Sequence, residues 1–309
     1  MRTLRLVMSL GVGLLMLIGV VACAQSNPAP FASSVLPTPA PTPLPAFSGD
    51  AAYQHVVAQT SLGPRATGTE AGRKTGDYIL GQLRAAGWQV ETQEFVYNGV
   101  QVRNIIGKQG SGPVTIVGAH YDTRRQADND PDLAKRTQPV IGANDGASGV
   151  AVLLELARTL DVRKTKREIW LTFFDAEDNG RLENWDWLVG STHLAESLTV
   201  TPTAMILLDM IGDADQNIYQ ERNSTPALTD SIWRVAAQLG YSDTLIAQPK
   251  WSIIDDHIPF MQRGIPAVDL IDFDYPYWHT TQDTADKVSP VSLERVGRTV
   301  KTWLEQTSP

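Results

Sequence analysis

The sequence predicts an α/β fold, a three-layer α/β/α sandwich around a mixed, largely parallel central sheet. Three observations lead to this prediction. Short apolar runs recur along the chain, and runs of this kind are typical of strands buried on both faces. Helical patterns lie between the runs, and such alternation is typical of a sheet covered on both sides. The chain has 309 residues, 42% of them hydrophobic, which is enough to bury such a core.

The first predicted elements are a helix and a hairpin. Residues 69–86 have a helical pattern that stops at Gly87, a residue suited to the left-handed position after a helix. Residues 89–97 and 100–107 are predicted strands, because Asn98-Gly99 between them is a strong hairpin turn signal. We therefore expect a hairpin ahead of the main run of strands.

The centre of the predicted sheet consists of four apolar segments connected by helices. Helical patterns cover residues 147–160, 187–197 and 225–239. Ser289 before Pro290 is a good N-cap and first-turn pair for a last helix that ends near residue 305. The four expected strands are residues 114–119, 169–174, 204–210 and 265–271.

The N-terminus has the features of a targeting segment. Two arginines within the first five residues precede an apolar stretch, residues 10–21, that is short for a membrane span and typical of a signal peptide. The sequence Val20-Val21-Ala22-Cys23 resembles the bacterial lipobox, whose cysteine is lipidated and becomes the first mature residue. We expect residues 1–22 to be a lipoprotein signal peptide and Cys23 to carry the lipid; a simple secretory signal with a free thiol is the alternative.

The predicted location is outside the cytoplasm. A lipid on Cys23 would anchor a secreted lipoprotein on the outer side of the cytoplasmic membrane or in the periplasm or cell envelope. Residues 23–47, rich in Pro, Ala, Ser and Thr, are expected to be an extended spacer before a catalytic domain at residues 48–309. The net charge of −8 and the absence of a Lys/Arg run argue against a nucleic-acid partner.

Polar side chains that can bind metals follow four of the apolar runs. Ligands of open α/β sheets bind beyond the carboxyl ends of the strands, and catalytic zinc takes imidazole and carboxylate ligands with one position left open. Asp145 lies in a loop of small residues, 142–149, that opens a helix and lets the backbone approach a metal closely. Any one of these residues could be a helix cap or an ordinary loop residue, but the set together indicates a zinc site. His120 and Asp122 follow the first run, Asp209 closes the third, and His279 lies in the loop after the fourth; the second run is followed by Asp175, Glu177 and Asp178.

Five ordered motifs within residues 48–309 carry a family resemblance. They are Gly118-Ala119-His120-Tyr121-Asp122, Asn144-Asp145-Gly146, Phe173-Phe174-Asp175-Ala176-Glu177-Asp178, Leu208-Asp209-Met210-Ile211-Gly212 and Trp278-His279-Thr280. This pattern resembles the zinc exopeptidases of the aminopeptidase Y/aminopeptidase S family. Glutaminyl-peptide cyclotransferases share that fold and belong to the same superfamily.

The resemblance implies a metal-binding role for five residues. Asp145 would bridge two zinc ions, and the Asp145-Gly146 peptide would be cis. His120 and Asp209 would complete one metal site, and Asp178 and His279 the other. Many relatives have Glu at the position of Asp178, whose shorter side chain reaches less far, so we expect two zinc ions with one as the alternative.

The resemblance also implies the catalytic roles. Glu177 would be the general base, taking a proton from a metal-activated water and giving it to the departing amine. Asp122 would orient His120 through its ring nitrogen. No large insertion separates the sheet motifs, so the compact chain is expected to be an aminopeptidase whose partner is a peptide with a free N-terminus.

Two other functions remain open at this point. The segments Asp255-Asp256-His257-Ile258-Pro259-Phe260 and Trp278-His279-Thr280 look very like animal glutaminyl cyclases, which form N-terminal pyroglutamate. In that chemistry Glu177 would move a proton from the α-amine to leaving ammonia, with Asp209 and Asp256 as hydrogen-bonding partners. Trp278, next to a proposed ligand, is the best candidate for a pocket wall. The second alternative is a lipoprotein binding module without catalytic activity.

Overall fold

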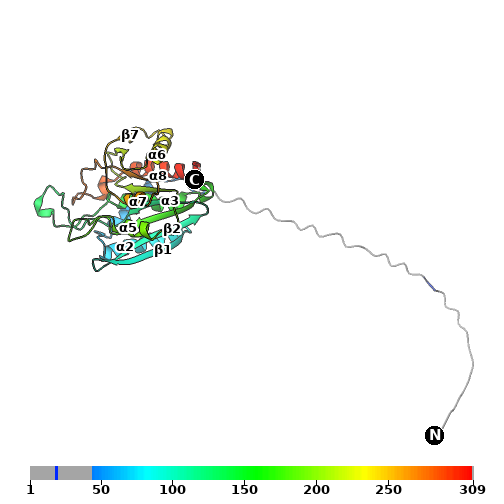
Figure 1. Ribbon diagram of the computed structural model, residues 1–309, viewed down its shortest axis with the longest axis horizontal. Helices are drawn as coiled ribbons and strands as arrows, with labels where there is room; N and C mark the ends of the chain where they lie inside the picture. Colours follow the sequence, from blue (N-terminus) through cyan, green and yellow to red (C-terminus); the bar gives the residue numbers. More distant parts are fainter. Residues whose placement is uncertain (1–17, 20–43, 308–309) are drawn as a thin grey trace, which may run out of the picture. The chain divides into compact units, whose positions relative to one another are not determined.

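The computed structural model describes residues 18–19 and 44–307 (Figure 1). The described residues 44–307 belong to one compact unit. The predicted signal peptide, Cys23 and most of the predicted spacer therefore lie outside the described residues. Within the described ranges, no helix has both the length and the apolar character needed to cross a bilayer.

The central sheet has six strands in the order β1-β2-β4-β3-β5-β8. The pairs β1–β2 and β2–β4 are antiparallel, whereas β4, β3, β5 and β8 run parallel to one another. The predicted mixed, largely parallel sheet is thus confirmed, and the carboxyl ends of its four parallel strands meet at one edge. The strands are β1 (Gln89–Tyr97), β2 (Val100–Gly110), β3 (Val114–His120), β4 (Glu168–Phe174), β5 (Ala204–Asp209) and β8 (Ala267–Ile271).

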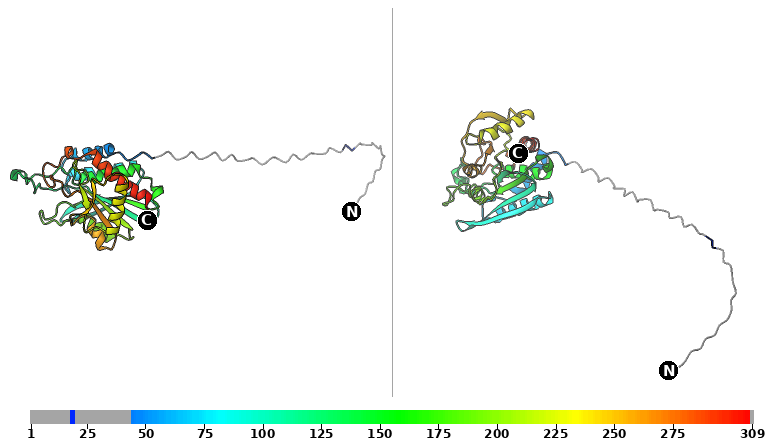
Figure 2. Two further views of the ribbon diagram at one scale, coloured as in Figure 1. Left: turned by 90° about the horizontal axis from the view of Figure 1, so that it is seen from above. Right: turned by 45° about the vertical axis from the view of Figure 1, so that its right-hand side comes forward.

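Helices cover both faces of the sheet, which confirms the three layers. The C-terminal helix α8, red in Figures 1 and 2, packs against α1 and α3 on one face, while α5 and α7 pack together on the other. A small parallel pair, β6 (Ile218–Gln220) and β7 (Leu245–Pro249), lies outside the main sheet. The helices are α1 (Gly49–Thr60), α2 (Glu70–Ala85), α3 (Ala147–Thr159), α4 (Val162–Thr165), α5 (Val189–Ser197), α6 (Pro226–Gln238), α7 (Ile258–Gln262) and α8 (Pro290–Gln306).

Burial on both faces explains why the strands are continuous apolar runs. In β3, Val117 and Ala119 belong to the core beneath α1, α3 and α8, whereas Val114 and Ile116 belong to the core beneath α5 and α7. Successive side chains of a strand point to opposite faces, and here both faces are covered. The strand therefore has no solvent-facing position along its whole length, and the run of apolar residues stops only at its last residue, His120.

Two differences from the sequence analysis concern the start of the domain. Phe47, assigned to the spacer, is buried, and a Cβ added at Gly297 would collide with its ring. Ser48 then caps α1, its hydroxyl accepting from the amide of Ala51 at 3.2 Å. The sequence has a helical pattern around His55 but predicted no bounds for this helix, because α1 has few large apolar residues. The predicted cap of the last helix is observed, since the hydroxyl of Ser289 accepts from Val291 N at 3.2 Å.

Candidate metal centre and active site

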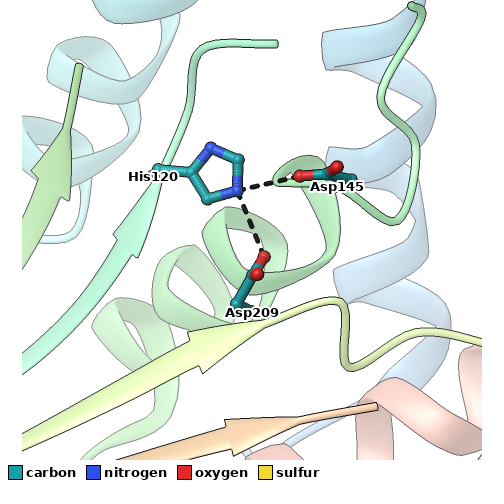
Figure 3. A group of neighbouring side chains, drawn as sticks. All are labelled: His120, Asp145 and Asp209. Atoms are coloured by element: carbon teal, nitrogen blue, oxygen red, sulfur yellow. Dashed lines mark hydrogen bonds and ion pairs between the residues drawn. The ribbon is translucent and has the colours of Figure 1, made fainter. Parts of the chain in front are cut away.

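The first part of the site is built from two strand ends. His120 is the last residue of β3 and Asp209 the last of β5. The two strands are parallel neighbours with Gly118 opposite Leu207, so their last side chains emerge side by side. His120 Nε2 lies 3.1 Å from Asp209 Oδ1, as Figure 3 shows. The register of the sheet therefore sets this pair.

Asp145 joins this pair from the turn that precedes α3. Its Oδ1 lies 3.1 Å from His120 Nε2 (Figure 3). The carboxylate of Asp283 accepts from the amides of Asn144 and Asp145 at 2.8 and 3.2 Å and so holds the turn in place. The Asp145–Gly146 peptide is cis, as the family resemblance implies. A Cβ at Gly146 would lie 2.5 Å from the carbonyl oxygen of His120, so only glycine fits there.

The second part of the site is built from two loops. Asp178 lies in the loop after β4, and His279 lies in the loop after β8. His279 Nε2 is 2.9 Å from Asp178 Oδ1 and 3.7 Å from Asp145 Oδ2. Asp145 thus presents one carboxylate oxygen to each histidine. Sequence analysis placed these five side chains together, and the structure does bring them together.

The two groups fit divalent cations. In each group, His120–Asp145–Asp209 and Asp145–Asp178–His279, the possible ligand atoms all lie within 4.8 Å of one another, and all the residues are buried. Asp145 Oδ2 and Asp178 Oδ2 are buried without a hydrogen-bond partner. Such oxygens are costly in the interior unless a proton or a cation satisfies them. Imidazole and carboxylate donors in this arrangement suit zinc.

The charges around the site favour a bound cation. Burial alone would lower the pKa of His279, but the carboxylates of Asp178 and Asp128 raise this pKa to about 9. Burial opposes charge on His120 as well, yet hydrogen bonds to Asp122, Asp145 and Asp209 raise its pKa well above the usual range. The negative field that holds a proton on each ring would equally hold a divalent cation in its place.

Asp122 has a broader structural role than predicted. Its Oδ1 lies 3.5 Å from His120 Nδ1, consistent with the expected contact. Its two oxygens also accept from the amides of Glu177 and Asp178 at 3.1 and 3.2 Å. One fully buried carboxylate therefore supports both a ligand histidine and the loop with the predicted base.

Glu177 lines a cavity of about 330 Å³ that is also lined by Asp145, Asp178, Asp209 and His279. Burial raises the pKa of Glu177 well above its usual range, His120 opposes this, and Asp178, Asp255 and Asp256 add to it. The apolar walls of this cavity include Met210, Ile253, Phe273, Trp187 and Trp278.

Of the Asp255-Asp256 pair, Asp256 was the residue expected to bind substrate, but Asp255 is the one that lines the cavity. Asp255 lines the cavity, whereas Asp256 does not and is fully buried. Burial and the nearby charge of Asp209 raise the pKa of Asp255 to about 7. His257 is also fully buried, with Nε2 3.4 Å from Glu221 Oε2. Trp278 lines the cavity as predicted from its position next to His279.

Sequence reasoning missed three carboxylates around the site. Asp128 Oδ1 lies 3.5 Å from His279 Nδ1, Asp283 holds the turn of Asp145, and Asp255 lines the cavity. The sequence could have indicated Asp255, because this residue is next to Asp256 in the same motif. Asp128 and Asp283 lie in irregular loops that no strand pattern marks.

The fold is that of the zinc exopeptidase superfamily, which includes glutaminyl cyclases, and the site groups side chains that could hold divalent cations. Residues 104–304 match Peptidase family M28, and the chain belongs to this family.

Individual relatives include both exopeptidases and cyclases. A Zn-dependent exopeptidase from Parabacteroides distasonis superposes with a TM-score of 0.81 at 33% identity, covering 85% of this chain and 100% of that one. A glutaminyl cyclase from Bacteroides thetaiotaomicron, bound to N-acetylhistamine, gives 0.80 at 33% identity, covering 86% and 100%. A glutaminyl-peptide cyclotransferase-like protein from Bos taurus is 25% identical over 283 residues, 78% of this chain and 72% of that protein.

Proposed function

We propose that this protein is a zinc-dependent glutaminyl-peptide cyclotransferase, which converts the N-terminal glutamine of a peptide to pyroglutamate. The observation that carries the proposal is Asp255, a buried acid that lines the same cavity as Glu177 and belongs to neither group of possible metal ligands. Further support comes from relatives whose names state this activity. This ranks cyclisation above the aminopeptidase activity that the sequence alone favoured.

Cyclisation makes specific chemical demands. The α-amine nitrogen attacks the side-chain amide carbon, a new C–N bond closes the ring, and the old C–N bond breaks to release ammonia. One proton must pass from the attacking nitrogen to the leaving nitrogen, and no water is consumed. The site must therefore hold the two ends of one residue together, exclude water and move a proton between them.

Side chains that line the cavity could meet each of these requirements. Glu177 would take the proton from the α-amine and deliver it to the leaving ammonia. Asp255 and Asp209 line the same cavity and would hydrogen-bond the amine and the amide. Trp278 and Phe273 would pack on the glutamine side chain and exclude water. A zinc ion held by Asp145, Asp178 and His279 would polarise the amide carbonyl as a Lewis acid.

An aminopeptidase is the second candidate, and one observation favours it. The two groups of possible ligands share Asp145, and a shared carboxylate of this kind would suit a pair of metal ions. In that reaction Glu177 would take a proton from the attacking water and give it to the departing amine. The complete set of ligands and base argues against the third possibility, a binding module without activity.

One substrate separates the three functions. With the peptide Gln-Phe-Ala, cyclisation releases ammonia and leaves pyroglutamyl-Phe-Ala, whereas hydrolysis releases free glutamine and Phe-Ala. We expect the first pair of products, loss of activity on chelation, and recovery with zinc. Free glutamine as the main product would replace the proposal by the aminopeptidase. Tight zinc binding with neither product would favour the binding module.

We also propose that the enzyme is a lipoprotein of the cell envelope, anchored through Cys23. The basic and apolar N-terminus and the lipobox-like Val20-Val21-Ala22-Cys23 support this proposal. Metabolic labelling with a fatty acid should mark the full-length chain in bacteria, and Cys23→Ser should remove both the label and the membrane fraction. Equal labelling of the Cys23→Ser variant would exclude the anchor.

A further inference from the structure

We infer that the loop of residues 250–254 is a subsite for the second and third residues of the peptide and prefers apolar side chains. The inference rests on the proposed function in one respect, namely that a peptide N-terminus enters the cavity. It adds a substrate class, glutaminyl peptides with an apolar residue after the glutamine. The evidence is the exposure, position and anchoring of this loop.

Two large apolar side chains are exposed on this one loop. Ile254 is 73% exposed and Trp251 is 36% exposed. Ile253 and Ile254 line the cavity that contains Glu177, so the exposed surface begins at its mouth. Elsewhere in residues 44–307, the large exposed apolar side chains are spread over separate elements. A pair of such residues beside a binding cavity indicates a surface that a ligand covers.

A row of aromatic rings connects this loop to the metal centre. The ring of Trp278 lies 4.0 Å from that of His279, and Phe273 lies 5.0 Å from Trp278. Trp251 meets Phe273 edge-on, with centroids 5.7 Å apart. An extended peptide advances about 3.3–3.6 Å per residue. When the first residue of a peptide lies at Trp278, its third residue is about 7 Å further on, and from there a side chain can reach Trp251.

The loop is held in place by hydrogen bonds of its backbone, one of them to a buried carboxylate. The carboxylate of Glu221 is almost fully buried and accepts from the amide of Ile253 at 2.9 Å. It also accepts from the amides of Asn223 and Ser224 at 2.9 and 2.7 Å. The carbonyl of Trp251 accepts from the amide of Arg222 at 2.8 Å. A pre-ordered loop loses little conformational entropy on binding, so its apolar contacts can add to affinity.

Binding to an inactive enzyme tests the subsite whatever the reaction is. In the zinc-loaded Glu177→Gln protein, calorimetry should show Gln-Phe-Ala binding about tenfold more tightly than Gln-Gly-Ala, as expected from partial burial of one apolar side chain. Adding Ile254→Ser should remove most of this ratio, and Trp251→Ala is a second variant of the same surface. The matched control is Leu133→Ser, because Leu133 is also 73% exposed but does not line the cavity.

Turnover then separates this inference from the proposed function. Glutamine amide has no second residue, so Ile254→Ser should change its KM much less than it changes the KM for Gln-Phe-Ala, and Leu133→Ser should change neither KM. For Gln-Phe-Ala, Ile254→Ser should raise KM about tenfold with little change in kcat. Absence of cyclisation with every glutamine substrate would refute the proposed function, while the binding ratio would still decide the subsite. Equal affinity for the Phe and Gly peptides, or an equal loss in Leu133→Ser, would overturn the inference.

Discussion

The two ligand groups that share Asp145 are built in different ways. His120 and Asp209 end neighbouring parallel strands, so the backbone ladder of β3 and β5 sets their separation. Asp178 and His279 lie in loops after β4 and β8, and contacts between side chains set the distance between them. We call these the strand group and the loop group. The sheet makes the strand group a rigid half of the site, whereas the loop group depends on its local supports.

The carboxylates next to Nδ1 of the two histidines also differ in how firmly they are held. Asp122, behind His120, is fully buried and also holds the amides of Glu177 and Asp178. Asp128, behind His279, has a side chain that is 38% exposed and is shared with Arg124 in an ion pair of 2.6 Å. Exposed ion pairs are weakened by solvent and salt. The loop group should therefore be the more easily perturbed half of the site.

The largest expected effect comes from changing the residue that joins the two groups. Asp145→Asn removes a charged ligand from both, so we expect zinc binding to weaken in both and turnover to fall by about a thousandfold or more. Metal analysis by mass spectrometry and the Gln-Phe-Ala assay measure the two effects. Full zinc content and near-normal turnover in this variant would show that neither group needs Asp145, and the idea of two groups joined by a shared ligand would be wrong.

The same contrast explains how far sequence reasoning could go. His120 and Asp209 were predictable because each directly follows a buried apolar run, and the parallel strands of such a sheet end at one edge. The fold was predictable for the same reason. Asp128 and Asp283 were not, because their positions depend on how irregular loops close in space. Asp256 was chosen over Asp255 because sequence cannot tell which of two adjacent carboxylates faces a cavity.

A second test separates catalysis from both ligand groups. Glu177→Gln removes a proton acceptor but no ligand of either group, so zinc content should stay unchanged while turnover falls by about 10²–10⁴-fold. Metal analysis and steady-state kinetics on one preparation give both values. Asp77→Asn is a suitable control, because Asp77 is an exposed carboxylate that pairs with Arg103 outside the cavity. Substantial residual turnover in Glu177→Gln would remove this residue from the proton-transfer role.

A third test asks which group carries the chemistry. If cyclisation needs only the loop group, His279→Ala should abolish activity, whereas His120→Ala should keep a measurable part of it. If both groups hold metal for hydrolysis, the two variants should lose activity to the same extent. Activity and zinc content of the pair, measured side by side at saturating zinc, distinguish these outcomes. Greater loss in His120→Ala than in His279→Ala would contradict the cyclisation proposal directly.

The smallest expected effects come from Asp122 and Asp128, the carboxylates next to Nδ1 of the two histidines. Changing them tests whether the strand group is held more firmly than the loop group. Removing such a partner typically lowers metal affinity about 10–100-fold. We expect Asp122→Asn at the upper end of this range, because the loop of Glu177 and Asp178 also loses its acceptor, and Asp128→Asn at the lower end. Zinc competition titrations measure both affinities.

The same titrations at low and high salt test the exposed ion pair. In the parent protein, the zinc affinity of the loop group should fall as the salt concentration rises, because the Asp128–Arg124 pair is partly exposed. Asp128→Asn should remove that salt dependence. A salt dependence that persists unchanged in Asp128→Asn would place the sensitivity elsewhere and would remove the difference in support between the two groups.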